Sequence, residues 1–159
     1  NLRQDKGYSY GYRSGIGWYT NSSFLIAGGS VQTSVTKEAV QETLKEFRDI
    51  QNDRPVNEAE FEAAKENLLR QFPAGFETAG QILDQLIQIA AFDLPDNYYR
   101  TLTENIQSVS LSDVRRVASE HLLSEHLAVV VVGDKNEVKE GLEQLGYPLR
   151  MVDSEGRIL

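Results

Sequence analysis

The chain of 159 residues has no cysteine, which excludes disulfide bonds and thiolate metal sites and fits either a reducing or an oxidising compartment. It also lacks an apolar run near the ~20 residues that a membrane-spanning helix needs. Basic residues are the minority, with 16 Lys and Arg against 24 Asp and Glu. A formal charge of −8 argues against a phosphate-binding surface. We therefore expect no membrane span and no nucleic-acid partner.

Histidine is almost as scarce, because the chain holds only His121 and His126. Five residues on an α-helix turn about 500°, which leaves the two imidazoles roughly 140° apart. They could not share one metal ion without a break in the helix. His121 also lies seven residues after Val114 and continues its apolar stripe. We expect a core or helix-end histidine and no metal site.

Other catalytic patterns are also missing. The chain has no cysteine nucleophile and no Gly-x-Ser-x-Gly elbow. Its glutamates crowd two segments at spacings that are typical of solvated helix faces with oppositely charged neighbours. These glutamates are Glu38, Glu42, Glu46, Glu58, Glu60, Glu62 and Glu66. A catalytic carboxylate pair is not indicated.

The N-terminal segment is the part of the chain that suggests chemistry. Arg3 leads through a charged turn into a strand with tyrosine at every second position, Tyr8, Tyr10 and Tyr12. Side chains alternate across a strand, so these three rings share one face. Such a stripe can cover a core, as aromatic side chains do in sheets. It can equally hold a peptide, since Arg and Tyr both donate hydrogen bonds to carbonyl oxygens.

Periodicity predicts strands first, helices next, and a strand-helix-strand ending. The expected strands are 8–19, 24–33, 127–132 and 149–152, the first two forming an antiparallel hairpin. The expected helices start at Thr36, at Asn57 with a capping box to Glu60, near Thr78, near Asn97, at Ser110 and before Val138.

Two of these segments carry specific expectations of burial. The Val-rich run 127–132 reads as a central strand or one covered on both faces. In the helix 78–92 the residues expected to point inward are Ile82, Leu83, Leu86, Ile87 and Ala90. The Gly28-Gly29 pair marks a bulge or a close backbone approach, and residues 153–156 form a turn. The fold class is α+β, one domain over 1–159 with an antiparallel-rich mixed sheet and helices packed on one face.

The order of these motifs resembles a known family. Leu2-Arg3, a few charged residues, Gly7, and Tyr10 seven residues beyond the Arg are similar to the start of the second-half strand in pitrilysin/insulinase-type zinc peptidases. Mitochondrial processing peptidase is one of them. The helix opening 110–114 and the strand 127–134 are later landmarks. The closing segments 145–148 and 153–156 resemble the ends of bacterial envelope members, which favours the periplasm or cell envelope.

The resemblance implies that the chain is the C-terminal, non-zinc half of such a peptidase. Arg3 and Tyr10 would then bind the substrate backbone, while a partner half carries the zinc on a His-x-x-Glu-His helix. That half would be part of the same polypeptide or a separate subunit. The chain itself is expected to bind no cofactor and to be inactive alone. The alternative is a non-enzymatic scaffold or subunit-contact domain of the same fold.

A full repeat of the family has a further strand and helix before the Arg-bearing turn. The chain begins with Asn, after the place where those elements would stand, so we expect a fragment of a longer chain with N-terminal elements missing. The sheet would then leave an exposed edge or apolar patch, which favours a homo-oligomer.

Overall fold

The computed structural model describes residues 9–122 and 126–159. These residues divide into two compact units, the first drawn from 9–17, 24–48 and 126–159, the second from 18–23 and 49–122. The described chain combines helices with an antiparallel sheet, so the predicted α+β class is confirmed. Among the described residues, no helix combines the length and the apolar character that crossing a bilayer requires.

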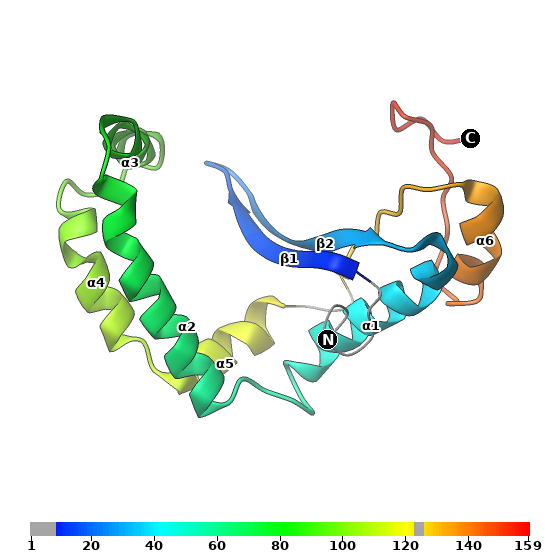
Figure 1. Cartoon of the computed structure of the whole chain (residues 1–159), viewed down its shortest axis with the longest axis horizontal. Helices are drawn as coiled ribbons and strands as arrows, with labels where there is room; N and C mark the ends of the chain where they lie inside the picture. The colour runs from blue at the N-terminus through cyan, green and yellow to red at the C-terminus, as the bar shows by residue number, and fades with distance from the viewer. Residues whose placement is uncertain (1–8, 123–125) are drawn as a thin grey trace. The chain divides into compact units, whose positions relative to one another are not determined.

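The sheet consists of two strands that form a hairpin, β1 (Ser9–Trp18) and β2 (Ser23–Val31), drawn side by side in blue in Figure 1. The two predicted N-terminal strands are therefore confirmed over the described residues. A Cβ added at Gly29 would fall onto the backbone oxygen of Gly11 and 3.1 Å from the Tyr12 Cα. The expected close backbone approach is thus present at Gly29. At Gly28 an added Cβ would meet nothing within 4 Å.

The first unit contains two α-helices and one short 3₁₀ helix among its described residues. They are η1 (Thr33–Val35), α1 (Thr36–Asp49) and α6 (Lys135–Glu143). Ala39 and Leu44 of α1 are buried. The Lys37 Nζ donates to Gln144 Oε1 at 2.6 Å, which ties α1 to the segment after α6. Gly146, at a φ of +77°, adopts the left-handed conformation after α6, as glycine often does where a helix ends.

The second unit is helical. Its elements are α2 (Glu58–Gln71), η2 (Phe72–Phe76), α3 (Ala79–Ala91), α4 (Tyr98–Ser108) and α5 (Leu111–His121). The capping box that the sequence predicts at Asn57 and Glu60 is formed, with backbone-to-side-chain distances of 2.9 and 3.0 Å. Helices α2 and α4 lie side by side (Figure 1), and Phe61 of α2 is buried.

An aromatic cluster joins η2 to the start of α4. The rings of Phe72 and Phe76 lie 5.1 Å apart, and Phe76 meets Tyr99 edge-on at 5.4 Å. Such pairs contribute about 0.5–1.5 kcal/mol beyond the area that they bury. Burial raises the pKa of the Tyr99 hydroxyl, with the neighbouring Tyr98 as a smaller cause. This cluster packs the start of α4 against η2, the segment that follows α2.

The predicted strand 127–132 is wrong. No strand is assigned to these residues, and Val130 and Val132 are 85% and 96% exposed. A strand forms only where another strand supplies hydrogen-bond partners, and in the described chain only β1 and β2 pair. The sheet is therefore smaller than the mixed sheet that the sequence predicted. Residues 149–152 likewise form only one isolated bridge, Val152 to Ile158.

The expected inward face of α3 is also wrong. Ile82, Leu83, Leu86 and Ile87 are 44–56% exposed, and Ala90 is exposed as well. Gln81, Gln85 and Ile89 are the half-buried residues of this helix instead. Periodicity shows which residues share a face, but not which element covers that face. In the described chain α3 turns its apolar stripe outward.

Candidate functional site

The structure describes only one of the two residues that were predicted to bind substrate. Arg3 lies outside the described residues. Tyr10 is the second residue of β1, and its backbone belongs to the hairpin. The pairing of Arg3 with Tyr10 on a peptide therefore stays a prediction.

Tyr12, two residues further along β1, has a packing role. Its hydroxyl lies 2.7 Å from the Thr43 Oγ1 of α1. Because the Thr43 hydroxyl donates its only proton to the Ala39 carbonyl oxygen at 2.8 Å, the Tyr12 hydroxyl must be the donor. One face of β1 thus packs on α1. For Tyr12 the sheet-packing interpretation of the tyrosine stripe fits.

A different set of residues lines an open part of the hairpin surface. An open cavity of about 390 Å³ lies there. Its lining residues come from both strands and are Arg13, Ser14, Gly15, Ile16, Gly17, Ile26 and Gly28. Arg13, Gly15 and Gly17 alternate along β1, so they occupy one face of the strand. The glycine-lined face of the hairpin is defined by Arg13, Gly15, Gly17, Ile26 and Gly28.

Neither packing nor backbone conformation explains Gly15 and Gly28. A Cβ added at Gly15 or Gly28 would meet nothing within 4 Å. The positive φ angles found at glycines belong to Gly146 and Gly156. Glycine inside a strand costs about 0.5–1 kcal/mol relative to alanine. The space above Gly15 and Gly28 is therefore left open at a cost to the stability of the hairpin, and such glycines often mark close approach of a ligand or another backbone.

Arg13 is the charged residue of this face. It is exposed, and among residues 9–122 and 126–159 its side chain forms no hydrogen bond or ion pair. Most other arginines of the described chain have such partners. Arg115, for example, donates from Nε and Nη2 to the Val56 carbonyl oxygen at 2.9 and 2.7 Å. The guanidinium of Arg13 is thus available to an external acceptor.

The two histidines lie at the end of α5 and in the segment after it. His121 is the last residue of α5, with a side chain that is 71% exposed and an Nε2 atom 4.0 Å from Glu120 Oε2. The helix-end position that the sequence predicted is confirmed. No group of three or more His, Cys, Asp or Glu residues in the described part of the chain could hold a metal ion. The described residues do not fit a zinc site.

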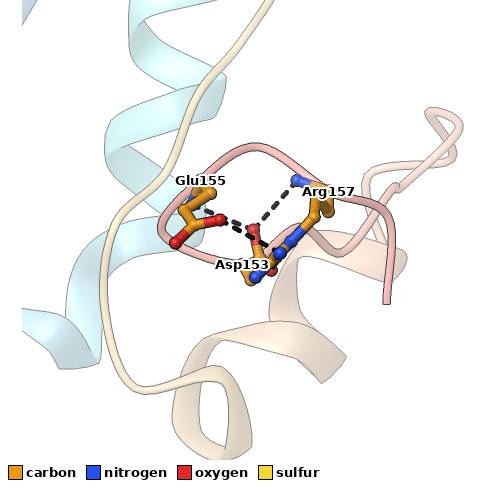
Figure 2. Close-up of polar contacts among 3 residues, drawn as sticks. All are labelled: Asp153, Glu155 and Arg157. Carbon is orange, nitrogen blue, oxygen red and sulfur yellow. Dashed lines mark hydrogen bonds and ion pairs between the residues drawn. The ribbon is translucent and has the colours of Figure 1, made fainter.

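The C-terminal turn is the densest polar cluster near the end of the chain (Figure 2). Asp153 accepts from the Arg157 Nε at 2.7 Å and from the backbone N–H groups of Arg157 and Glu155 at 2.9 Å each. These bonds, led by the one from the Arg157 side chain, lower the pKa of the Asp153 carboxyl. The predicted turn at 153–156 is confirmed. Its polar groups satisfy one another, so the cluster is structural.

The sequence reasoning missed the glycine-lined face. A signal was available, because Arg13, Gly15 and Gly17 alternate in one strand. The sequence also did not show that the neighbouring residues Gly28 and Gly29 have different surroundings. Only the pairing of the two strands shows that Gly29 approaches the backbone of Gly11 while Gly28 faces open space.

A comparison with protein families shows which residues of the chain are similar to a known domain. Residues 1–68 match the family described as the peptidase M16 inactive domain. The matched segment includes Arg3, Tyr10, both strands, α1 and most of α2. No curated protein matches the chain. Over residues 1–68 the chain is therefore similar to the C-terminal, inactive domain of the pitrilysin/insulinase family.

Proposed function

We propose that the chain is the substrate-gripping half of a zinc metalloendopeptidase, acting together with a half that binds the zinc. The observation that carries the proposal is the match to an inactive peptidase domain over residues 1–68. That match begins on the Arg3-to-Tyr10 segment, which has the residue types needed to hold a peptide backbone. The partner half belongs to the same polypeptide or to a separate subunit.

The chemistry asked of Arg3 and Tyr10 is hydrogen-bond donation. A guanidinium and a phenol both donate to carbonyl oxygens, and the charge on a substrate carbonyl oxygen grows as it is attacked. One preorganised donor of this kind contributes about 3 kcal/mol to lowering the barrier, which is roughly a hundredfold in rate. The described residues offer no metal ligand set, so activation of the attacking water is assigned to the partner half.

A second function, a scaffold or subunit-contact domain, is favoured by a specific observation. Tyr12 packs against α1 through Thr43, so at least one tyrosine of the stripe serves the fold. The exposed apolar residues of 127–132 and of α3 fit the same role, since contiguous apolar surface marks interaction sites. Under this alternative no peptide is held, and the chain assembles with a partner or with further copies of itself. Sedimentation at high concentration tests self-assembly: an assembly larger than a monomer is expected, and a monomer contradicts it.

Reconstitution distinguishes the two functions. The chain is combined with a zinc-bearing half, in one polypeptide or as two subunits, and hydrolysis of a quenched fluorescent peptide is followed. Arg3→Ala is expected to lower kcat about a hundredfold or more while the far-UV circular dichroism spectrum stays unchanged. Lys6→Ala, which removes a nearby charge of the same sign, is the matched control and should leave kcat within about twofold. Equal activity of Arg3→Ala and Lys6→Ala would leave the scaffold function as the better account.

A further inference from the structure

We propose that the glycine-lined face of the β1–β2 hairpin binds an extended peptide segment that carries an acidic side chain. The proposal goes beyond the proposed function, because the residues that define this face include neither Arg3 nor Tyr10. The acidic group would pair with Arg13, and a compact apolar side chain would lie over Gly15 and Gly28.

The first support is the shape of this face. The cavity of about 390 Å³ is lined by three glycines together with Arg13, Ser14, Ile16 and Ile26. Since a Cβ at Gly15 or Gly28 would meet no atom within 4 Å, the chain itself does not fill the space. Residues two apart on a strand lie about 6.4–6.8 Å from each other on the same face. In an extended peptide, side chains two residues apart also lie on one face with this spacing. One side chain of such a peptide can therefore lie at Arg13 while the side chain two residues away lies above Gly15.

The second support is charge complementarity. Between Lys6 and Lys37 the sequence has no Asp or Glu, although the whole chain has 24 of them against 16 basic residues. Arg13 is the charged residue of the two strands, and its guanidinium has no partner among the described residues. Lys37, by contrast, donates to Gln144. A carboxylate is the acceptor that best matches an unpaired guanidinium, because the two form paired, charge-assisted hydrogen bonds.

These observations favour a peptide over other anionic partners. Nucleic acid is held by several cations that track its phosphates, whereas this face has one cation in a chain of net charge −8. A partner helix is about 10–12 Å wide, and two strands spaced about 4.8 Å apart form a narrower platform. An extended segment with alternating side chains matches the width and the repeat of the hairpin.

The test uses the 159-residue chain and a labelled peptide as the probe. The peptide is fluorescein-Ser-Ser-Glu-Ser-Val-Ser-Val-Ser-Ser, and its partner has Gln in place of Glu. Fluorescence anisotropy gives Kd for the wild type, Arg13→Gln, Gly15→Val and Gly11→Val. Gly11→Val is the matched control, because it places the same side chain on the same strand, in open space and outside the cavity lining.

We expect the Glu peptide to bind the wild type about tenfold more tightly than it binds Arg13→Gln or Gly15→Val. Gly11→Val should stay within about twofold of the wild type. The preference for Glu over Gln should vanish in Arg13→Gln, as a double-mutant cycle requires for a direct pair. Arg13→Gln keeps the test valid even if Gly15→Val alters the fold, which circular dichroism reports.

Three results would overturn the inference: no binding of the Glu peptide by the wild type, equal Kd values for wild type and Arg13→Gln, or tighter binding of oligo(dT) that displaces the peptide. The proposed function fails separately. If Arg13→Gln weakens peptide binding while Arg3→Ala leaves turnover of the assembled peptidase unchanged, the peptide site stands and the role of Arg3 falls. If Arg13→Gln leaves peptide binding unchanged while Arg3→Ala lowers turnover, the peptide site falls and the role of Arg3 stands.

Discussion

Two neighbouring glycines of β2 should respond oppositely to the same substitution. A methyl group at Gly29 would fall onto the Gly11 carbonyl oxygen, with the Gly11 carbonyl carbon and the Tyr12 Cα both 3.1 Å away. These are backbone atoms of the paired strand, so they cannot move without separating the hairpin. Overpacking of this kind costs about 1–3 kcal/mol. Gly28 has open space instead.

The magnitudes follow from these environments. Replacing glycine by alanine within a strand recovers about 0.5–1 kcal/mol of conformational entropy and propensity. Gly28→Ala should therefore stabilise the chain by about that amount. Gly29→Ala should destabilise it by about 1–2 kcal/mol, since the overpacking outweighs the same gain. Between the two variants we expect a difference of about 2 kcal/mol, or roughly 4–8 °C in Tm for a chain of this size.

Urea unfolding followed by far-UV circular dichroism measures this difference, and thermal unfolding gives the Tm values. Each variant serves as the control for the other, because the amino-acid change is identical and the positions are adjacent. Equal stability of Gly28→Ala and Gly29→Ala, or a more stable Gly29→Ala, would refute the close approach of β2 to Gly11. It would also refute the reasoning that the space above Gly28 is open.

Three further predictions concern single polar contacts. Tyr12→Phe removes the hydrogen bond to Thr43 and should cost about 0.5–1.5 kcal/mol in urea unfolding; an unchanged midpoint would contradict the packing of β1 on α1. Ser110→Ala removes the hydroxyl that caps α5 by accepting from the Asp113 N–H, and it should lower the free energy of unfolding by about 1 kcal/mol. An unchanged free energy of unfolding would contradict the cap. The pKa of Asp153 is lowered in the folded chain, so its stabilisation is present above the ordinary value of 3.8 and is lost as pH falls through the folded value. Between pH 7 and pH 3 the wild type should lose more Tm than Asp153→Asn; equal losses would contradict this.

Local signals in the sequence predicted local structure well. The capping box at Asn57 and Glu60 and the helix start at Ser110 depend on residues three positions apart, and both are formed. The hairpin was also predictable, since aromatic and β-branched runs on either side of the turn cluster are typical of paired strands. The C-terminal turn depends on Asp153 accepting from residues up to four positions away, so sequence was again sufficient.

Features that depend on distant partners were not predictable. The run 127–132 has the composition of a covered strand, but no other strand in the described chain pairs with it. The stripe of Ile82 and Leu86 has the spacing of a buried helix face, yet it is exposed. The glycine-lined face was missed for a similar reason, because it depends on which residues of β2 lie opposite Gly15. Composition and periodicity carry none of this information.

The tyrosines of β1 allow the most direct test of the central claim, that the chain contributes a hydrogen-bond donor to peptide hydrolysis. Tyr10→Phe and Tyr12→Phe each remove one hydroxyl from the same strand, and only Tyr10 matches the family spacing. In the assembled peptidase we measure kcat for both variants with one fluorogenic peptide. The account predicts that Tyr10→Phe lowers kcat about a hundredfold while Tyr12→Phe lowers stability and leaves kcat within about twofold. Equal kcat values for the wild type and Tyr10→Phe would contradict it.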